Sequence, residues 1–261
     1  MQPTRFEIDG VRYYRTGDDP NRFYPSVTAI LGKTSSEASK KALNTWSLNN
    51  PGGREAAAKR GTAIHYGAEC YARGLPVEIP EEYQCYWRGI EGMLDRYDGF
   101  LWSEKPLRPE WKFCTGEDDI SRLWSHKYQY CGCPDIIGTI NNTVVLADFK
   151  TSVNPYYRHY SKDRKDNRAF SGFSKYRKCA MQLAAYAMAC EETLGLRVDC
   201  AQIMVSTPET FQNFYVLGDE LQRYKIKWRQ KVREYWDIVA REQGEAHQAA
   251  AESPAELLES A

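Results

Sequence analysis

Two apolar runs that meet at a pair of asparagines place the strongest constraint on how this chain can fold. Residues 135–140 and 143–150 both have the apolar, β-branched composition of strands, and only Asn141 and Asn142 separate them. Asn is one of the few residues that tolerate the positive φ angles of a two-residue hairpin turn. The sequence therefore predicts an antiparallel hairpin in the middle of the chain.

The register of this hairpin brings charged side chains together. If Ile140 pairs with Thr143, then Asp135 lies directly opposite Asp148, with Cβ atoms about 5 Å apart. Lys150 follows Asp148 by two residues, so strand alternation places it on the same face. Two facing carboxylates repel each other unless one is protonated or a cation lies between them, and carboxylate oxygens favour Mg²⁺ or Mn²⁺. The alternative is an Asp–Lys ion pair on a solvated hairpin rim.

Pro134-Asp135 followed by Asp148-Phe149-Lys150 resembles the signature of the PD-(D/E)XK nuclease superfamily. The surrounding segments are similar to its RecB-like exonuclease branch, which includes phage exonucleases and mitochondrial genome maintenance exonucleases. Further matches occur in the order that this branch shows, namely residues 25–28, 60–65, Glu110, Thr151-Ser152 and 182–186.

The resemblance implies an α/β fold with a restriction-endonuclease-like core, a central mixed β-sheet flanked by helices. It also implies metal-dependent hydrolysis of DNA phosphodiester bonds, starting from the ends of single-stranded DNA. An endonuclease that uses the same centre, or a catalytically inactive DNA-binding module, is the alternative.

The same resemblance implies roles for individual residues. Asp135, Asp148, Glu110 and His65 are expected to bind the metal, and Lys150 is expected to complete the catalytic set. A lone helical His is more often a surface or core residue, and Glu110 lies unusually far before the hairpin, which leaves Glu117 as a substitute.

Several polar and basic residues are candidates for contacts with DNA. Gln182 and Tyr186 share one face of an otherwise apolar helix, where they either contact DNA or form a core hydrogen bond. Residues 154–178 contain eight Lys or Arg, two Asp and interleaved aromatics, a composition suited to single-stranded DNA, or else to a solvated loop. The expected DNA contacts are Arg60, Thr151, Ser152, Arg158, Lys162, Arg164, Lys165, Lys175, Gln182 and Tyr186.

Composition limits the remaining function classes. The chain has 35 basic residues (Lys and Arg) and 35 acidic residues (Asp and Glu), so it has no overall positive charge. A nucleic-acid partner would therefore have to bind local patches of basic side chains. No apolar run approaches the roughly 20 residues that a membrane helix needs, and residues 1–10 lack a signal-peptide pattern. We expect no membrane partner and a cytoplasmic location, which is the host cytoplasm if the gene belongs to a phage. Nothing in the sequence names a protein partner.

The eight cysteines form no C-x-x-C pair, and most lie in apolar runs as packed thiols. Cys131 and Cys133, with His126, are an alternative metal site. The spacing of Cys179, Cys190 and Cys200 does not fit the clamp of related iron–sulfur proteins, so no cluster is expected.

Residues 1–241 are expected to form one nuclease domain with an N-terminal hairpin and helical embellishment, and residues 242–261 a disordered tail. The periodicity of the sequence predicts helices over residues 54–73, 81–100, 179–194 and 221–239. It predicts further strands over residues 109–115, 127–133, 201–206 and 211–217.

Overall fold

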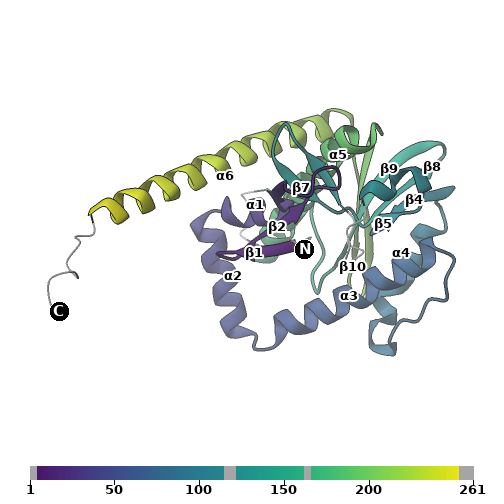
Figure 1. Cartoon of the computed structure of the whole chain (residues 1–261). Helices are drawn as coiled ribbons and strands as arrows, with labels where there is room; N and C mark the ends of the chain where they lie inside the picture. The colour runs from purple at the N-terminus through teal and green to yellow at the C-terminus, as the bar shows by residue number, and fades with distance from the viewer. Residues whose placement is uncertain (1–4, 115–121, 162–165, 253–261) are drawn as a thin grey trace, which may run out of the picture.

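A six-stranded mixed sheet forms the centre of the molecule in a computed structural model (Figure 1). The structure describes residues 5–114, 122–161 and 166–252, and it describes side chains as far as Gly244. The strand order is β11-β10-β9-β8-β4-β5. The strands are β4 (Gly99–Ser103), β5 (Lys105–Pro106), β8 (Ile136–Ile140), β9 (Thr143–Thr151), β10 (Cys200–Ser206) and β11 (Phe211–Leu217). Only the β9–β10 pair is parallel. The expected α/β architecture with a central mixed sheet is confirmed.

The hairpin formed by β8 and β9 has the register that the sequence predicts. Ile140 pairs with Thr143, and the pairing continues without a shift to Ile136 opposite Ala147. Asn141 and Asn142 have φ angles of 48° and 60°, as the primed turns of tight hairpins require. The local turn chemistry therefore fixes the alignment of the two central strands.

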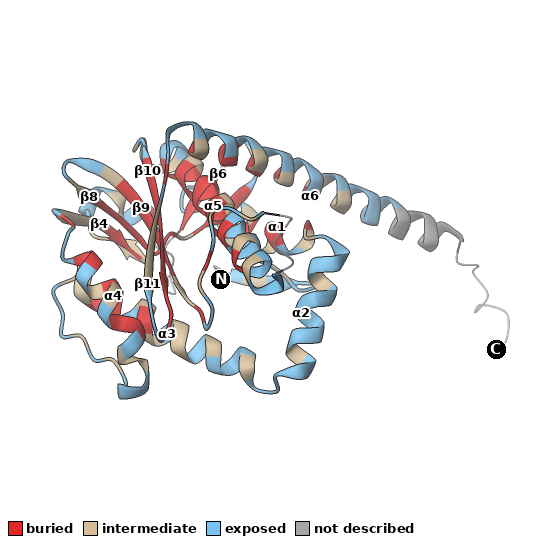
Figure 2. Cartoon of the chain, turned by 180° about the vertical axis from the view of Figure 1, so that it is seen from behind, coloured by how far each residue is buried: buried red, intermediate tan, exposed pale blue. Residues whose placement is uncertain are grey.

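The two faces of the sheet belong to two separate clusters of buried side chains. Ile137 and Leu146 pack against the helices α5 (Asn167–Leu194) and α6 (Gly218–Glu252). Ile136 and Ala147, which alternate with them, pack against α3 (Gly53–Ala72) and α4 (Gln84–Leu94). Buried residues accordingly follow the strands and the inner face of α5 (Figure 2). The sheet thus lies between two helical layers.

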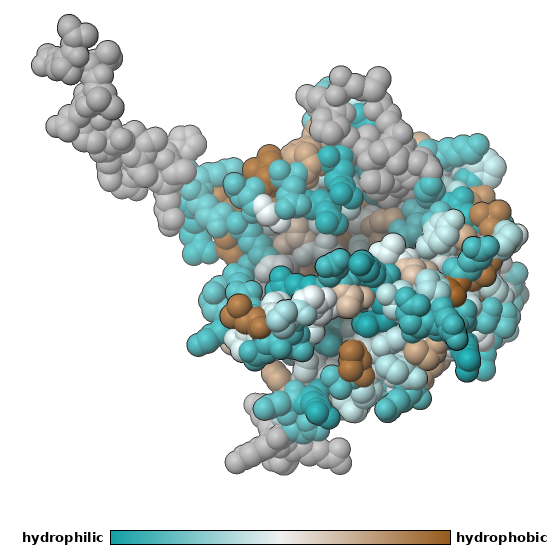
Figure 3. Space-filling model, turned by 90° about the horizontal axis from the view of Figure 1, so that it is seen from below, coloured by the Kyte–Doolittle hydropathy of each residue, from teal (hydrophilic) through white to brown (hydrophobic). Residues whose placement is uncertain are grey.

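Smaller elements surround this core. A three-stranded antiparallel sheet and a two-stranded ribbon lie beside α1, and an isolated bridge between Ser26 and Cys131 joins them. These elements are β1 (Arg5–Ile8), β2 (Val11–Arg15), β3 (Phe23–Pro25), α1 (Val27–Lys33), β6 (Leu123–Ser125) and β7 (Tyr130–Gly132). The helix α2 (Glu37–Asn49) has no buried residue. Seen from below, most of the described surface is hydrophilic, with hydrophobic side chains in small patches (Figure 3).

Several expectations about the elements are wrong in detail. Residues 109–115 do not form a strand, because Pro109–Cys114 is the short 3-10 helix η2. The helix predicted to begin at Cys179 begins at Asn167, where the Asp166 side chain accepts hydrogen bonds from two backbone amides and caps it. Helix α6 continues to Glu252, beyond the expected start of a disordered tail, because its Ala- and Glu-rich sequence favours helix; residues 253–261 lie outside the described residues.

The helix expected over residues 81–100 is also shorter than predicted. A second 3-10 helix, η1 (Glu81–Tyr83), precedes α4, which ends at Leu94, and residues 99–100 already belong to strand β4. All eight cysteines are free. Within the described residues, no helix is both long and apolar enough to cross a membrane.

Candidate active site

The two aspartates of the central hairpin are both buried at one end of the sheet. Asp135, just before β8, is 8% exposed, and Asp148, within β9, is 1% exposed. The backbone N–H of Phe149 donates a 2.6 Å hydrogen bond to Asp135 Oδ2. This bond ties the carboxylate of the first strand to the backbone of the second, so the hairpin holds Asp135 in place.

His65 reaches the same place from helix α3. Its Nδ1 atom lies 3.4 Å from Asp135 Oδ1 and 3.4 Å from Glu104 Oε1. The imidazole ring also packs edge-on against Phe149, with ring centroids 5.8 Å apart. The expected position of His65 near the carboxylates is therefore what the structure shows.

Glu104 is the acidic residue that sequence reasoning missed. It lies between β4 and β5 with a φ of 53°, and its N–H donates a 2.9 Å bond to the Asp135 carbonyl. Ser103 pairs with Ile136, so the next residue along β4 falls beside Asp135. The only sequence signal is an acidic residue two positions after the apolar run 100–102, and nothing local shows which strand that run pairs with.

Glu110, the residue expected to fill this role, does not approach the centre. It is exposed in η2, where Arg108 Nη1 donates a 3.3 Å hydrogen bond to its carboxylate. A local backbone hydrogen bond, followed by the hydrogen bond and charge of Arg108, holds the pKa of Glu110 below its ordinary value. Glu117, the substitute, lies outside the described residues.

His65, Glu104 and Asp135 form a donor set that fits a divalent cation. One ligand atom from each lies within 4.8 Å of the others. Burial lowers the pKa of His65, but the charge of Asp135 and hydrogen bonds to both carboxylates outweigh it and raise that pKa to about 10. Burial, with the Asp135 charge, also raises the pKa of Glu104. The cluster thus stabilises a positive charge between its carboxylates, and a bound divalent ion would take the place of the imidazole proton.

Asp148 is not part of that donor set and forms a second buried unit beside it. Its Oδ2 forms an ion pair with Lys150 Nζ, and Gln182 Nε2 lies 3.3 Å from Oδ1. Burial and the Asp135 charge raise the pKa of Asp148 to about 6, against the opposing effect of Lys150. Burial lowers the pKa of Lys150, but Asp148 outweighs this and raises it well above the ordinary value. The shift of Asp148 thus works against its ionisation, whereas the shift of Lys150 favours its charged form.

Gln182 and Tyr186 form the core hydrogen bond that was one of two interpretations of their spacing. Gln182 Nε2 lies 2.9 Å from the Tyr186 hydroxyl and also donates to Asp148, so it links the hairpin to α5. Both side chains are buried. They orient Asp148 rather than lie on an exposed surface.

The residues expected to contact DNA are distributed over several parts of the molecule. Lys175 Nζ lies 3.5 Å from Ser152 Oγ, directly after β9, and Thr151 ends that strand. Arg158 donates to the Tyr176 hydroxyl and to the Tyr215 carbonyl, so it is engaged within the fold. The Arg60 guanidinium stacks on the Tyr86 ring at 4.7 Å, and Lys162, Arg164 and Lys165 lie outside the described residues.

The alternative site at Cys131, Cys133 and His126 does not form. The Cys133 thiol donates to the Glu104 carbonyl at 3.3 Å, and the His126 ring contacts Asp18 at 2.8 Å. Cys131 is buried against the Tyr14 carbonyl. Burial raises the pKa of both thiols, so they are neutral packed groups.

The His65 cluster opens onto a pocket of about 550 Å³. Its walls come from α3, the N-terminal sheet and the β4–β5 segment, and they include Arg5, Tyr14, Thr62, Tyr66 and Lys105. Charged and aromatic groups thus line the pocket beside His65 and Glu104. Through this pocket, His65 and Glu104 are accessible from solvent.

Comparisons with known proteins add little to this description. No family model matches the chain, and no curated protein matches its sequence. Among solved structures, the crystal structure of SSO0001 aligns with 15% identity over 77% of this chain and 68% of that chain, at a TM-score of 0.34. A similarity this weak supports no conclusion about fold or activity.

Proposed function

We propose that the chain is a divalent-metal-dependent deoxyribonuclease that hydrolyses phosphodiester bonds from the ends of single-stranded DNA. The observation that carries the proposal is the buried donor set of His65, Glu104 and Asp135 next to the Asp148–Lys150 ion pair. Two carboxylates, an imidazole and an adjacent ammonium group match the needs of metal-assisted phosphoryl chemistry. The choice of an end-directed enzyme rests on the resemblance of the sequence motifs to the RecB-like exonuclease branch.

The donor set suits Mg²⁺ or Mn²⁺. Hard carboxylate oxygens favour both ions, and the imidazole of His65 shifts the preference toward Mn²⁺. A divalent ion held there would polarise the scissile phosphate and lower the pKa of a bound water. The chain's own contribution is to hold three ligands in a fixed arrangement, through the Phe149 amide and the bond between Glu104 and the Asp135 carbonyl.

Lys150 supplies a fixed positive charge beside the donor set. Its ammonium group remains protonated because Asp148 is buried against it. An ammonium held in this way can orient a water nucleophile or offset the negative charge that grows on the phosphate. Gln182 and Tyr186 hold Asp148, and therefore Lys150, in position.

A basic groove supports DNA as the substrate class. The groove, about 450 Å³, lies between α1, α2, α5 and α6 and contains no acidic lining residue. Its cations are Lys40, Lys175, Arg177, Lys178 and Lys231. Lys175 also contacts Ser152, two residues beyond Lys150, so a backbone held in the groove would lead toward the ion pair. Phosphate groups bind such a lining of Lys and Arg without sequence preference.

The test is digestion of end-labelled linear single-stranded DNA and of the same sequence as a covalent circle. Reactions contain Mg²⁺, Mn²⁺ or EDTA, with the wild type and Asp148→Asn. Metal-dependent loss of the linear strand alone, abolished in the variant, is the expected result.

Each other outcome identifies an alternative. Cutting of the circle as well would make the protein an endonuclease with the same centre. Binding of the strand without products in either metal would make it a catalytically inactive DNA-binding module.

A further inference from the structure

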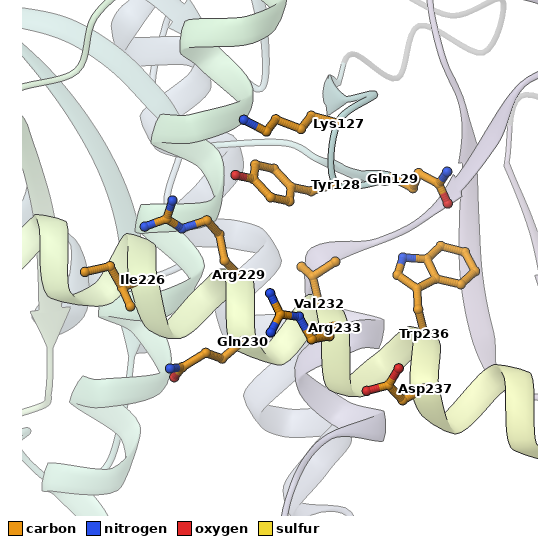
Figure 4. Close-up of a pocket in the computed structure, with 10 residues that line it drawn as sticks. All are labelled: Lys127, Tyr128, Gln129, Ile226, Arg229, Gln230, Val232, Arg233, Trp236 and Asp237. Atoms are coloured by element: carbon orange, nitrogen blue, oxygen red, sulfur yellow. The ribbon is translucent and has the colours of Figure 1, made fainter.

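A groove between the β6–β7 ribbon and helix α6 has an apolar floor. It measures about 600 Å³ and lies beside the turn of this ribbon (Figure 4). Val232 is buried, Trp236 is half-buried, and Ile226 is 47% exposed. None of the residues that line this groove lines the pocket around His65. The groove is therefore separate from the candidate active site.

Cations on both sides of this groove lack acidic partners. Arg229 and Arg233 project from successive turns of α6, and Lys127 projects from the ribbon (Figure 4). In the described part of the chain, no carboxylate forms an ion pair with any of the three, and Asp237 is the only acidic lining residue. The net positive charge of the rim would attract a negatively charged partner.

A second hollow of about 540 Å³ shares Arg229 with this groove. Its lining includes Gly195, Arg197 and Gln222, and its one acidic residue, Glu191, is paired with Lys225. The helix rises 1.5 Å per residue, so the stretch from Gln222 to Trp236 is about 20 Å long. At about 3.3 Å per residue, an extended peptide of about six residues would cover it.

Trp236 offers a hydrogen bond that nothing in the described residues accepts. Its Nε1 atom is buried and has no acceptor among them. A buried indole N–H normally finds a partner. A carbonyl or carboxylate group of a peptide in the groove would provide one if the indole ring turned toward the groove.

We propose that this groove binds an acidic peptide segment of a partner protein, with an apolar side chain over Val232 and Trp236 and carboxylates against Arg229, Arg233 and Lys127. Nucleic acid fits less well, because single strands bind by stacking bases on open aromatic faces. Here the Lys127 ammonium already lies 5.5 Å from the centre of the Tyr128 ring, and Trp236 is half-buried. The inference does not depend on the proposed nuclease activity.

The experiment measures binding of a fluorescein-labelled hexapeptide, four acidic residues followed by Leu and Phe, by fluorescence anisotropy. The proteins are the full-length wild type, the double variant Arg229→Glu with Arg233→Glu, and Arg223→Glu as a matched control. Arg223 is exposed on the same helix but does not line the groove. An unlabelled single-stranded oligonucleotide serves as competitor.

We expect micromolar binding by the wild type, a loss of at least tenfold in the double variant, and a change of less than twofold in the control. The oligonucleotide should not displace the peptide. Absence of binding by the wild type, equal binding by the double variant, or displacement by the oligonucleotide would overturn the proposal. Circular dichroism of each variant separates lost binding from lost folding.

Discussion

Glu104 and Asp135 lie side by side because the backbone N–H of Glu104 donates to the carbonyl of Asp135, at 2.9 Å. This bond continues the β4–β8 pairing by one residue beyond Ser103 and Ile136. Two acidic residues that are distant in sequence thus become neighbours through strand pairing alone. Their side chains then share one imidazole, that of His65.

Glu104→Gln should weaken both metal binding and cleavage. The amide keeps the volume of the side chain but removes one of the charged oxygens of the donor set, so we expect Mn²⁺ affinity to fall about 10- to 100-fold, with a matching loss of activity. Isothermal titration with Mn²⁺ and the digestion assay measure the two effects. Glu110→Gln is the control and should change neither, because that carboxylate is exposed on η2. The assignment of Glu104 is wrong if the two variants behave alike.

Lys150→Met should lower the cleavage rate by roughly 10²–10³, which is typical of losing one preorganised charged donor. The substitution retains most of the aliphatic stem but removes the ammonium beside Asp148. Single-turnover cleavage at saturating DNA measures the rate, and thermal melting verifies that the variant folds. A folded variant with near-normal cleavage would show that Lys150 has no part in the chemistry.

Gly132→Ala should disturb the position of Asp148 indirectly, because residue 132 packs against Tyr186 and Tyr186 is hydrogen-bonded to Gln182. A Cβ atom at residue 132 would lie 2.3 Å from Tyr186 Cε1, so the ring must move, and Gln182 loses its neighbour. We expect a loss of about 1–3 kcal/mol in the free energy of unfolding, the usual cost of overpacking, together with reduced cleavage.

The matched control for this change is Gly92→Ala on α4. A Cβ atom there meets nothing within 4 Å, and alanine favours helix. We expect unchanged or slightly increased stability by urea denaturation. Equal destabilisation by both substitutions would contradict the predicted role of the Gly132–Tyr186 contact.

Stability should fall above about pH 10. Burial raises the pKa values of Tyr97, Tyr130 and Tyr186 above that of an unfolded tyrosine. A raised native pKa favours the protonated phenol in the folded state, so the contribution is complete below about pH 10 and is lost as the pH rises through the native pKa.

Urea denaturation at pH 8 to 11 measures this dependence, with a slope of up to about 1.4 kcal/mol per pH unit for each tyrosine. Tyr97→Phe should reduce the slope, because Tyr97 is buried and its hydroxyl donates to Gln202. A flat profile over this range would show that the buried phenols do not titrate with unfolding.

The sequence predicted the hairpin and its charged face because these depend on local information. Turn residues and side-chain alternation are sufficient to set the register of two adjacent strands, and the positions of Asp135, Asp148 and Lys150 follow from them. His65 also lies at the expected place. The resemblance to a known nuclease superfamily supplied that residue, and a lone helical histidine would not have indicated it.

The third carboxylate could not be predicted, because it depends on which strand pairs with the outer edge of β8. That choice is made by tertiary packing of β4 against the sheet, and no motif near Glu104 marks it. The order of the motifs in the sequence predicts Glu110, but Pro109 begins a 3-10 helix, and the exposed Glu110 side chain lies away from the centre. Likewise, the basic stretch before Cys179 was interpreted as a loop, although the Asp166 cap starts a helix there.

The length of the turn at Asn141 and Asn142 determines how the charged side chains at the other end of the hairpin are aligned. Asp135 lies six residues before the turn, about 20 Å along an extended strand. One added residue at the turn would offset the two strands by a step and turn the side chains of one strand to the opposite layer. Asp135 would then lose its place beside Phe149, and Lys150 would no longer share its face, although no side chain of the site had been altered. A change in loop length, far from any reacting atom, would therefore be as damaging as removal of a ligand.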